Sequence, residues 1–337
     1  MQNISLLSVI IPTYNEEKHI EECIESILKQ DYPVIFTEIL VVDGMSSDRT
    51  REIVKSYSEK YPFIKLLDNP HRIVPFAMNA GIENACGEYV IRLDAHAAYP
   101  PDYFSALVKY AQKYNTDNIG GVCITDVKNK TNKSWAIKTV LSHKFGVGNA
   151  TFRTGASKPK IVDTVPFGCF KRDVFERFGK YDERLVRNQD IELNKRIAKG
   201  GGKIMLIPEI TCTYFARETF SGLAKNNYKN GFWNILTVYY TKNFQSLSLR
   251  HFIPLLFVFS LILPILLSVF YFNLIWLALL SLALYTFALL IISVSISRHR
   301  VWKVFFLFPA FMLLHLSYGI GSIAGIFKIL ILKLEGK

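Results

Sequence analysis

An aspartate and a histidine two positions apart, Asp94 and His96, stand at the end of the apolar run 89–93. Residues i and i+2 of an extended backbone project on the same side, so this carboxylate and imidazole would face one ligand. Such a pair can hold a divalent cation whose other ligands are water and phosphate oxygens, and the mixed donors suit Mn²⁺ somewhat better than Mg²⁺. On spacing alone, a loop aspartate beside an incidental histidine remains the alternative.

Three further carboxylates occupy positions where they could act on a ligand or only cap a helix. Asp190 falls in the first turn of a helix expected from Asn188 onwards, where it could be a general base that accepts a proton from a hydroxyl. Asp43 directly follows the apolar run 38–42, and Glu16 follows the run 8–12. All three also suit the positive end of a helix dipole, so position alone leaves both interpretations open.

The elements that would position these residues alternate in type along the first part of the chain. Mainly apolar runs predict strands at residues 8–12, 38–42, 64–67 and 89–93, and helical spacing of apolar residues predicts helices at 16–30, 49–60 and 77–86. This alternation favours an α/β fold with a mostly parallel sheet, which binds ligands beyond the carboxyl ends of its strands. No Gly-x-Gly-x-x-Gly or Gly-Lys-Ser/Thr motif occurs, so a dinucleotide dehydrogenase or a P-loop enzyme would lack its phosphate-binding loop.

The second part of the chain has a different composition. The net charge of the 337 residues is +12, yet residues 251–297 and 304–327 contain no Asp, Glu, Lys or Arg. A helix needs about 20 apolar residues to cross a bilayer, so we expect membrane spans near 252–272, 274–297 and 304–325. The five cysteines are scattered and predict reduced thiols. The basic residues are dispersed and no recognition motif is present, so we expect no nucleic acid as a partner.

Five segments follow one another in a recognisable order: residues 9–17, 41–50, 77–81, 87–96 and 188–190. In this order they resemble the motifs of the family 2 glycosyltransferases. The Asp-Ala-His-Ala sequence from Asp94, the segment 148–153 and the apolar tail resemble the succinoglycan-type exopolysaccharide glucosyltransferase branch. The resemblance implies a GT-A fold, a Rossmann-like nucleotide-sugar-binding domain, and a nucleotide-sugar donor that is UDP-linked.

The resemblance also assigns roles residue by residue. It places the cation on Asp94 and His96, where the family motif is normally Asp-x-Asp, and it makes Asp190 the catalytic base, with Gln189 where the family has glutamate. It assigns nucleotide-sugar binding to seven residues: Pro12, Thr13, Tyr14, Glu16, Asp43, Asn79 and Asp94.

The expected domain order is a catalytic domain at 1–217, interfacial amphipathic helices at 218–250 and a membrane region at 251–337. Basic residues precede the first span and follow the second, as in Arg298–Lys303, which predicts that the catalytic domain faces the cytoplasm of a multi-pass cell-membrane protein. Lysines after the third segment would lie outside if that segment crosses, and inside if its course is re-entrant or interfacial. Both courses remain open from the sequence.

These expectations combine into one reaction. A single base without a carboxylate nucleophile predicts an inverting displacement, in which a hexose such as glucose moves from a UDP-sugar to a hydroxyl of a polyprenyl-diphosphate-linked saccharide. A divalent cation, Mn²⁺ or Mg²⁺, would neutralise the leaving diphosphate. Two alternatives stay open: a polyprenyl-phosphate sugar synthase, and a membrane scaffold whose transferase site has degenerated at His96 and Gln189.

Overall fold

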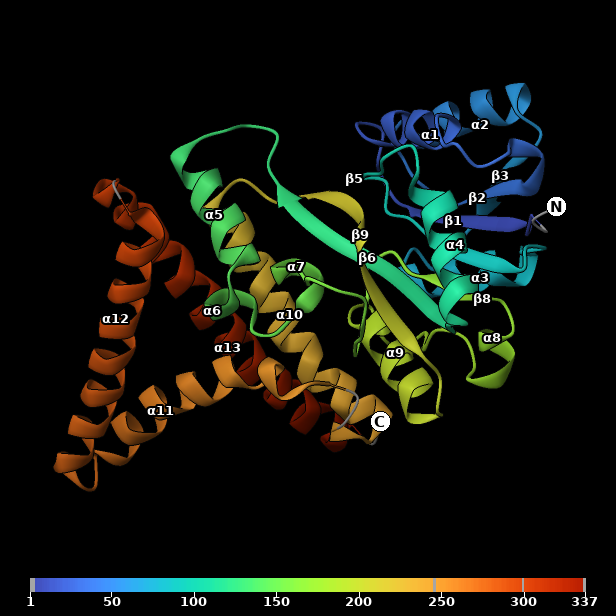
Figure 1. Cartoon of the computed structure of the whole chain (residues 1–337). Helices are drawn as coiled ribbons and strands as arrows, with labels where there is room; N and C mark the ends of the chain where they lie inside the picture. The colour runs from blue at the N-terminus through green and yellow to red at the C-terminus, as the bar shows by residue number, and fades with distance from the viewer. Residues whose placement is uncertain (1–3, 245–246, 299, 336–337) are drawn as a thin grey trace. The chain divides into compact units, whose positions relative to one another are not determined.

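A computed structural model describes residues 4–244, 247–298 and 300–335 (Figure 1). The chain forms two compact units. The sheet unit comprises Met1–Ile124 and Thr151–Phe215, and the helical unit comprises Thr125–Ala150 and Ala216–Lys337. The segment Thr125–Ala150 therefore belongs with the C-terminal helices, although sequence analysis expected one catalytic domain over residues 1–217.

The first half of the sheet is parallel, as predicted. Strand β1 pairs in parallel with β2 on one side and β4 on the other, and β3 pairs with β2. Helices α1, α2 and α3 connect these strands. The bounds are β1 Leu7–Thr13, α1 Ile20–Leu28, β2 Thr37–Asp43, α2 Thr50–Lys60, β3 Ile64–Asp68, α3 Val74–Asn84 and β4 Tyr89–Arg92.

The second half makes the sheet mixed, because β8 pairs antiparallel with both β4 and β6. The order is β3-β2-β1-β4-β8-β6-β9-β5, with β7 on β9. A Cβ at Gly121 would lie 2.0 Å from the Ile210 carbonyl oxygen, so only glycine permits this close strand approach. The bounds are β5 Ala97–Ala98, α4 Tyr103–Tyr114, β6 Asn118–Asp126, α7 Thr151–Thr154, β7 Lys160–Ile161, β8 Cys169–Lys171, α8 Val174–Arg177, α9 Gln189–Lys199 and β9 Ile204–Phe215.

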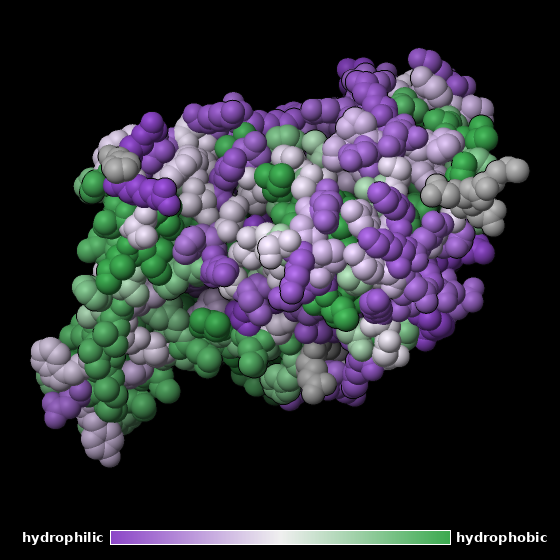
Figure 2. Space-filling view, viewed as in Figure 1, coloured by the Kyte–Doolittle hydropathy of each residue, from purple (hydrophilic) through white to green (hydrophobic). Residues whose placement is uncertain are grey.

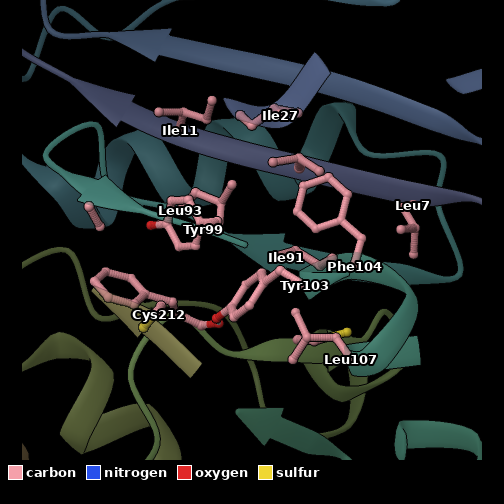
Figure 3. Packing of buried hydrophobic residues seen from close by; sticks show 14 of the residues in the cluster. Leu7, Ile11, Ile27, Ile91, Leu93, Tyr99, Tyr103, Phe104, Leu107 and Cys212 are labelled. Atoms are coloured by element: carbon pink, nitrogen blue, oxygen red, sulfur yellow. The ribbon is translucent and has the colours of Figure 1, made fainter. Parts of the chain in front are cut away.

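Both faces of the sheet are covered by apolar side chains. On one face, Ile11 and Ile91 belong to one buried apolar cluster with Tyr103 and Phe104 of α4 (Figure 3). On the other face, the neighbouring Ile10 belongs to a second buried cluster that includes residues of α3 and α9. Successive side chains of a strand point to opposite faces, which explains why the strands are continuous apolar runs.

The helical unit contains the three apolar helices that sequence analysis expected. Stretches long and apolar enough to cross a membrane are Leu249–Leu267, Phe272–Ser297 and Val301–Leu334. Figure 2 shows a broad apolar surface over α11 and α12. The bounds are α5 Asn132–Ser142, α6 Lys144–Val147, α10 Phe220–Thr241, α11 Ile253–Leu267, α12 Ile275–Ser297 and α13 Val304–Leu334.

Helix α5 joins the helical unit through its apolar face. Ile137 and Val140 are fully buried in one cluster with Phe311 and Leu314 of α13, and Leu223 of α10 also belongs to that cluster. Thr131 caps the helix, since its side chain accepts from the backbone N–H of Ser134 at 3.1 Å. Burial against α13 is the physical reason that this segment separates from the sheet.

Candidate active site

A pocket of about 160 Å³ lies at the carboxyl ends of β1 and β4. Its walls come from the end of β1, the loop before α3, the start of α3 and the residues that follow β4. The pocket lies at the edge of the sheet where ligand binding is expected, because parallel strands present their carboxyl ends at one edge. The lining residues are Pro12, Thr13, Tyr14, Glu16, Asn69, Arg72, Ile73, Val74, Ala77, Arg92, Asp94, Ala95 and His96.

A buried arginine joins two of the predicted functional carboxylates. Arg92, on β4, donates from Nη2 to Oδ1 of Asp94 at 3.0 Å and from Nη1 to Oδ1 of Asp190, at the start of α9. The arginine side chain is 10% exposed, whereas those of Asp94 and Asp190 are 23% and 38% exposed. One cation therefore holds the expected donor-side carboxylate and the expected base together.

The surroundings of this bridge shift the pKa values of Asp190 and Arg92. Desolvation raises the pKa of the Asp190 carboxyl above its ordinary value, and the nearby Asp94 charge acts in the same direction against the lowering effect of Arg92. Although desolvation opposes it, the attraction of the two carboxylates keeps the pKa of Arg92 well above its usual range. Arg92 is thus a permanent cation, while Asp190 accepts a proton more readily than an exposed aspartate.

The backbone at Asp94 is fixed from within the core. Its N–H donates to the Tyr99 hydroxyl at 2.9 Å, and that hydroxyl donates back to the Asp94 carbonyl oxygen at 3.3 Å. The Tyr99 ring packs edge-on against Phe167, with centroids 5.7 Å apart. Figure 3 shows Tyr99 beside Leu93, the residue that precedes Asp94 in the sequence. The apolar core therefore determines where the Asp94 carboxylate lies.

Of the two predicted cation ligands, His96 lies close to Glu16, whereas Asp94 is bonded to Arg92. Nδ1 of His96 lies 3.7 Å from Oε1 of Glu16, and its ring meets Tyr214 edge-on at 5.8 Å. Within the described ranges, no group of three or more His, Cys, Asp or Glu side chains is arranged to hold a metal ion. The donors present fit a cation that takes most of its ligands from a diphosphate and water, as Mg²⁺ commonly does.

Asp43 is buried completely and bonded at both carboxylate oxygens. Oδ1 accepts from the hydroxyls of Thr13 at 3.2 Å and Ser46 at 2.6 Å, and Oδ2 accepts from the Ser46 N–H at 2.8 Å and Arg51 at 2.9 Å. A carboxylate offers about four acceptor positions, and all are used here. Asp43 lies outside the pocket lining, so it positions Thr13 and would need to exchange a partner to contact a nucleotide.

Asn79 is also a positioning residue in this structure. Its amide nitrogen donates to the Tyr181 carbonyl at 3.0 Å and to Glu183 at 2.9 Å, while its oxygen accepts from the Tyr181 N–H at 2.9 Å. It is not among the residues that line the pocket, and its place near the nucleotide stays a prediction. Asn79 instead ties α3 to the segment that leads to Asp190.

Two arginines of the pocket region were missed by sequence analysis. Arg92 interrupts an otherwise apolar strand, and a charged residue inside a buried strand was the signal that could have revealed it. Arg72 lines the pocket, and its backbone has a left-handed conformation with φ 61°. Nearby in the fold, Arg153 stacks over Tyr214 at 5.3 Å, which puts a third guanidinium near the His96 side of the site.

Comparison with known proteins gives consistent sequence matches. The sequence profile described as Glycosyl transferase family 2 matches residues 8–179. A Methanococcus voltae protein, dolichyl N-acetyl-alpha-D-glucosaminyl phosphate 3-beta-D-2,3-diacetamido-2,3-dideoxy-beta-D-glucuronosyltransferase, is 28% identical over 70% of this chain and 78% of its own length. Succinoglycan biosynthesis protein ExoA of Rhizobium meliloti is 32% identical over 62% of this chain and 63% of its own length.

Solved structures show the same architecture at low identity. The mannosyltransferase PcManGT of Pyrobaculum calidifontis, in complex with GDP-Man and Mn²⁺, aligns with a TM-score of 0.60 and 19% identity over 95% of this chain and 88% of its own. TarS 1-349 of S. aureus in complex with UDP-GlcNAc aligns with a TM-score of 0.54 and 16% identity, covering 95% and 91% of the two chains.

Proposed function

Because this chain belongs to glycosyl transferase family 2, we propose that it transfers a hexose such as glucose from a UDP-sugar to a lipid-linked saccharide. The expected GT-A fold is confirmed by the mixed sheet and its structural neighbours. Relatives named for a dolichyl-linked acceptor and for succinoglycan biosynthesis support a membrane glycan as the product.

The donor would occupy the pocket at the carboxyl ends of β1 and β4. Tyr14 is partly exposed there and offers a ring face to a base, while Thr13 and Glu16 offer polar contacts to the nucleoside. Asp94 and His96 would hold Mn²⁺ or Mg²⁺ beside the diphosphate. When bound, the cation neutralises negative charge on the leaving nucleoside diphosphate.

The observation that carries the proposal is the Asp94–Arg92–Asp190 bridge. It couples a carboxylate of the donor pocket to a carboxylate that can act as a base toward the acceptor. The acceptor hydroxyl oxygen forms a bond to the anomeric carbon, the bond from that carbon to the diphosphate breaks, and Asp190 takes the hydroxyl proton. With one base in this role, the displacement inverts the anomeric configuration.

The helical unit supports a location at the cell membrane. Its apolar helices are long enough to span a bilayer, and the acceptor we propose, a polyprenyl-diphosphate-linked saccharide, cannot leave that bilayer. Nucleotide sugars are made in the cytosol, so we propose a multi-pass protein whose sheet unit faces the cytoplasm. This orientation agrees with the basic residues that flank the first two apolar helices.

The test supplies membranes containing the full chain with a panel of labelled nucleotide sugars, with and without Mn²⁺. We expect one UDP-sugar to label a lipid-extractable saccharide, with inverted anomeric configuration, and Asp190→Asn to abolish that label. Retention of configuration from an α-linked donor would contradict the single displacement. Labelling of polyprenyl phosphate itself, independent of Asp190, would identify the polyprenyl-phosphate synthase instead, and no labelling with any donor would favour the scaffold.

A further inference from the structure

Helices α10 and α13 are packed along their length, more extensively than any other helix pair among the described residues. A Cβ on Gly231 of α10 would lie 1.9 Å from the Tyr318 carbonyl oxygen, and one on Gly321 of α13 would lie 2.0 Å from that of Tyr228. Ser322 donates to the Gly231 carbonyl at 3.2 Å. Small residues bring the two backbones together here, so α10 would have to accompany α13 into any membrane that α13 crosses.

The contact extends well beyond this crossing of glycines. Leu223, near the start of α10, is buried with residues of the first half of α13, and Gly325 approaches Phe232 and Ile235 further along. The stretch from Leu223 to Ile235 is about 18 Å of helix. Figure 1 shows both helices running toward the C-terminal end of the chain.

Helix α10 carries charge over the same stretch. Lys225 and Lys229 are both exposed, and asparagines at positions 226, 227, 230 and 234 lie between or beside them. A lysine side chain is strongly disfavoured at the centre of a bilayer. If α13 crossed the membrane, the packed stretch of α10 would be carried into the hydrocarbon with its two lysines. The hydropathy of α13 permits a membrane crossing, but the two lysines of the packed helix α10 disfavour it.

The opposite face of α13 fits the boundary between headgroups and acyl chains. Exposed apolar residues recur there at helical spacing, and because a helix turns 100° per residue they lie on the side away from the α10-facing glycines. They are Ile320, Phe327, Leu330, Ile331 and Leu334, with exposures from 47% to 88%. Lys328 and Lys333 flank this stripe, where long side chains can reach the headgroups.

We propose that α10 and α13 form an interfacial platform that lies on a phospholipid bilayer and does not cross it. The apolar stripe enters the acyl boundary, and the four lysines (Lys225, Lys229, Lys328 and Lys333) meet anionic headgroups. The chain then ends on the face of the membrane where α10 lies, which is the face of the sheet unit because only residues 216–219 separate β9 from α10. The inference rests on the proposed membrane attachment and not on the identity of the sugar or acceptor.

Impermeant thiol labelling of the full chain in sealed vesicles of both orientations tests which face the end of α13 occupies. Cys86 is the exposed native cysteine, so it marks the face of the sheet unit, and its replacement by serine gives the background for Lys333→Cys and for the matched control Lys225→Cys on α10. We expect both new cysteines to label from the face that labels Cys86. Labelling of Lys333→Cys from the opposite face, or from neither face, would overturn the proposal.

A depth measurement gives an independent readout. Ile320 is 49% exposed and lies near the middle of α13, so a crossing helix would place a nitroxide at Ile320→Cys about 15 Å deep, at the bilayer centre. The platform predicts about 5–10 Å in vesicles of mixed phosphatidylcholine and phosphatidylglycerol. A central depth would overturn the platform. Release of the chain by an alkaline wash would instead remove the membrane attachment on which the proposed function depends.

Discussion

Replacing Arg92 with methionine removes the one cation that joins Asp94 and Asp190, and it keeps a flexible side chain of similar length in the strand. At contact distance and an effective dielectric constant near 20, each charge pair is worth on the order of 4 kcal/mol. Because the side chain of Asp190 is 38% exposed, solvent screening reduces its pair to about 1 kcal/mol. Losing this attraction raises the pKa of Asp190 further, because the carboxylate loses its neighbouring cation.

The pH dependence of sugar transfer measures this change. A base must be ionised to accept a proton, so activity rises with pH through the pKa of Asp190, which desolvation already raises above the ordinary aspartate value. We expect the acid limb of Arg92→Met to lie at higher pH than that of the parent, with transfer on that limb reduced up to about fivefold, which corresponds to about 1 kcal/mol. Arg92→Lys is the matched control, since it keeps the charge but loses the planar fork and should give a smaller change. An unchanged acid limb with full activity in Arg92→Met would refute the coupling of the two carboxylates.

Three further variants test the remaining assignments. Asp190→Asn should keep donor binding, measured by UDP-sugar titration, while transfer falls about 10²–10⁴-fold; unimpaired transfer would remove Asp190 as the base. Asp94→Ala should abolish the Mn²⁺ dependence of donor binding, measured by the same titration, and an undiminished dependence would reject it as a cation ligand. Asn79→Ala leaves the buried backbone groups of Tyr181 unpaired, so thermal unfolding should show a loss of about 1–3 kcal/mol. Asn84→Ala, which loses only a bond to the Ala80 carbonyl on the same helix, is its control and should change little.

The parallel half of the fold was predictable because β1, β2 and β4 are buried on both faces and β3 keeps a mainly apolar sequence at the edge of the sheet. Such strands are mainly apolar in sequence, and residues 8–12, 38–42, 64–67 and 89–93 lie within or overlap β1 to β4. Three strands of the antiparallel half, β5, β7 and β8, were not predictable, since they are only two or three residues long and carry no periodicity. The packing of α5 could not be predicted for a different reason: its apolar face contacts α13, which lies more than 150 residues away in sequence.

In the candidate site, too, some features could be predicted from the sequence and others could not. Residues that follow a strand directly, such as Thr13, Glu16 and Asp94, could be placed at the carboxyl edge from the order of elements alone. Side-chain partnerships could not, because they depend on packing between distant segments. Asp43 is occupied by Arg51 and Ser46, and Asn79 by a loop about 100 residues later. Spacing identifies which residues are near an edge, but not which of them are already bonded.

The discontinuous helical unit has a consequence for how the protein is made. Helix α5 ends at Ser142 and its partner α13 begins at Val304, so 161 residues must be synthesised between the two helices. At a synthesis rate of about 5–20 residues per second, the apolar face of α5 stays without its partner α13 for roughly 8–30 s. Targeting of the nascent chain to the membrane would shorten the exposure of that face to the cytosol. A truncation after the sheet would leave it uncovered permanently, so aggregation during synthesis is the expected fate of such a fragment.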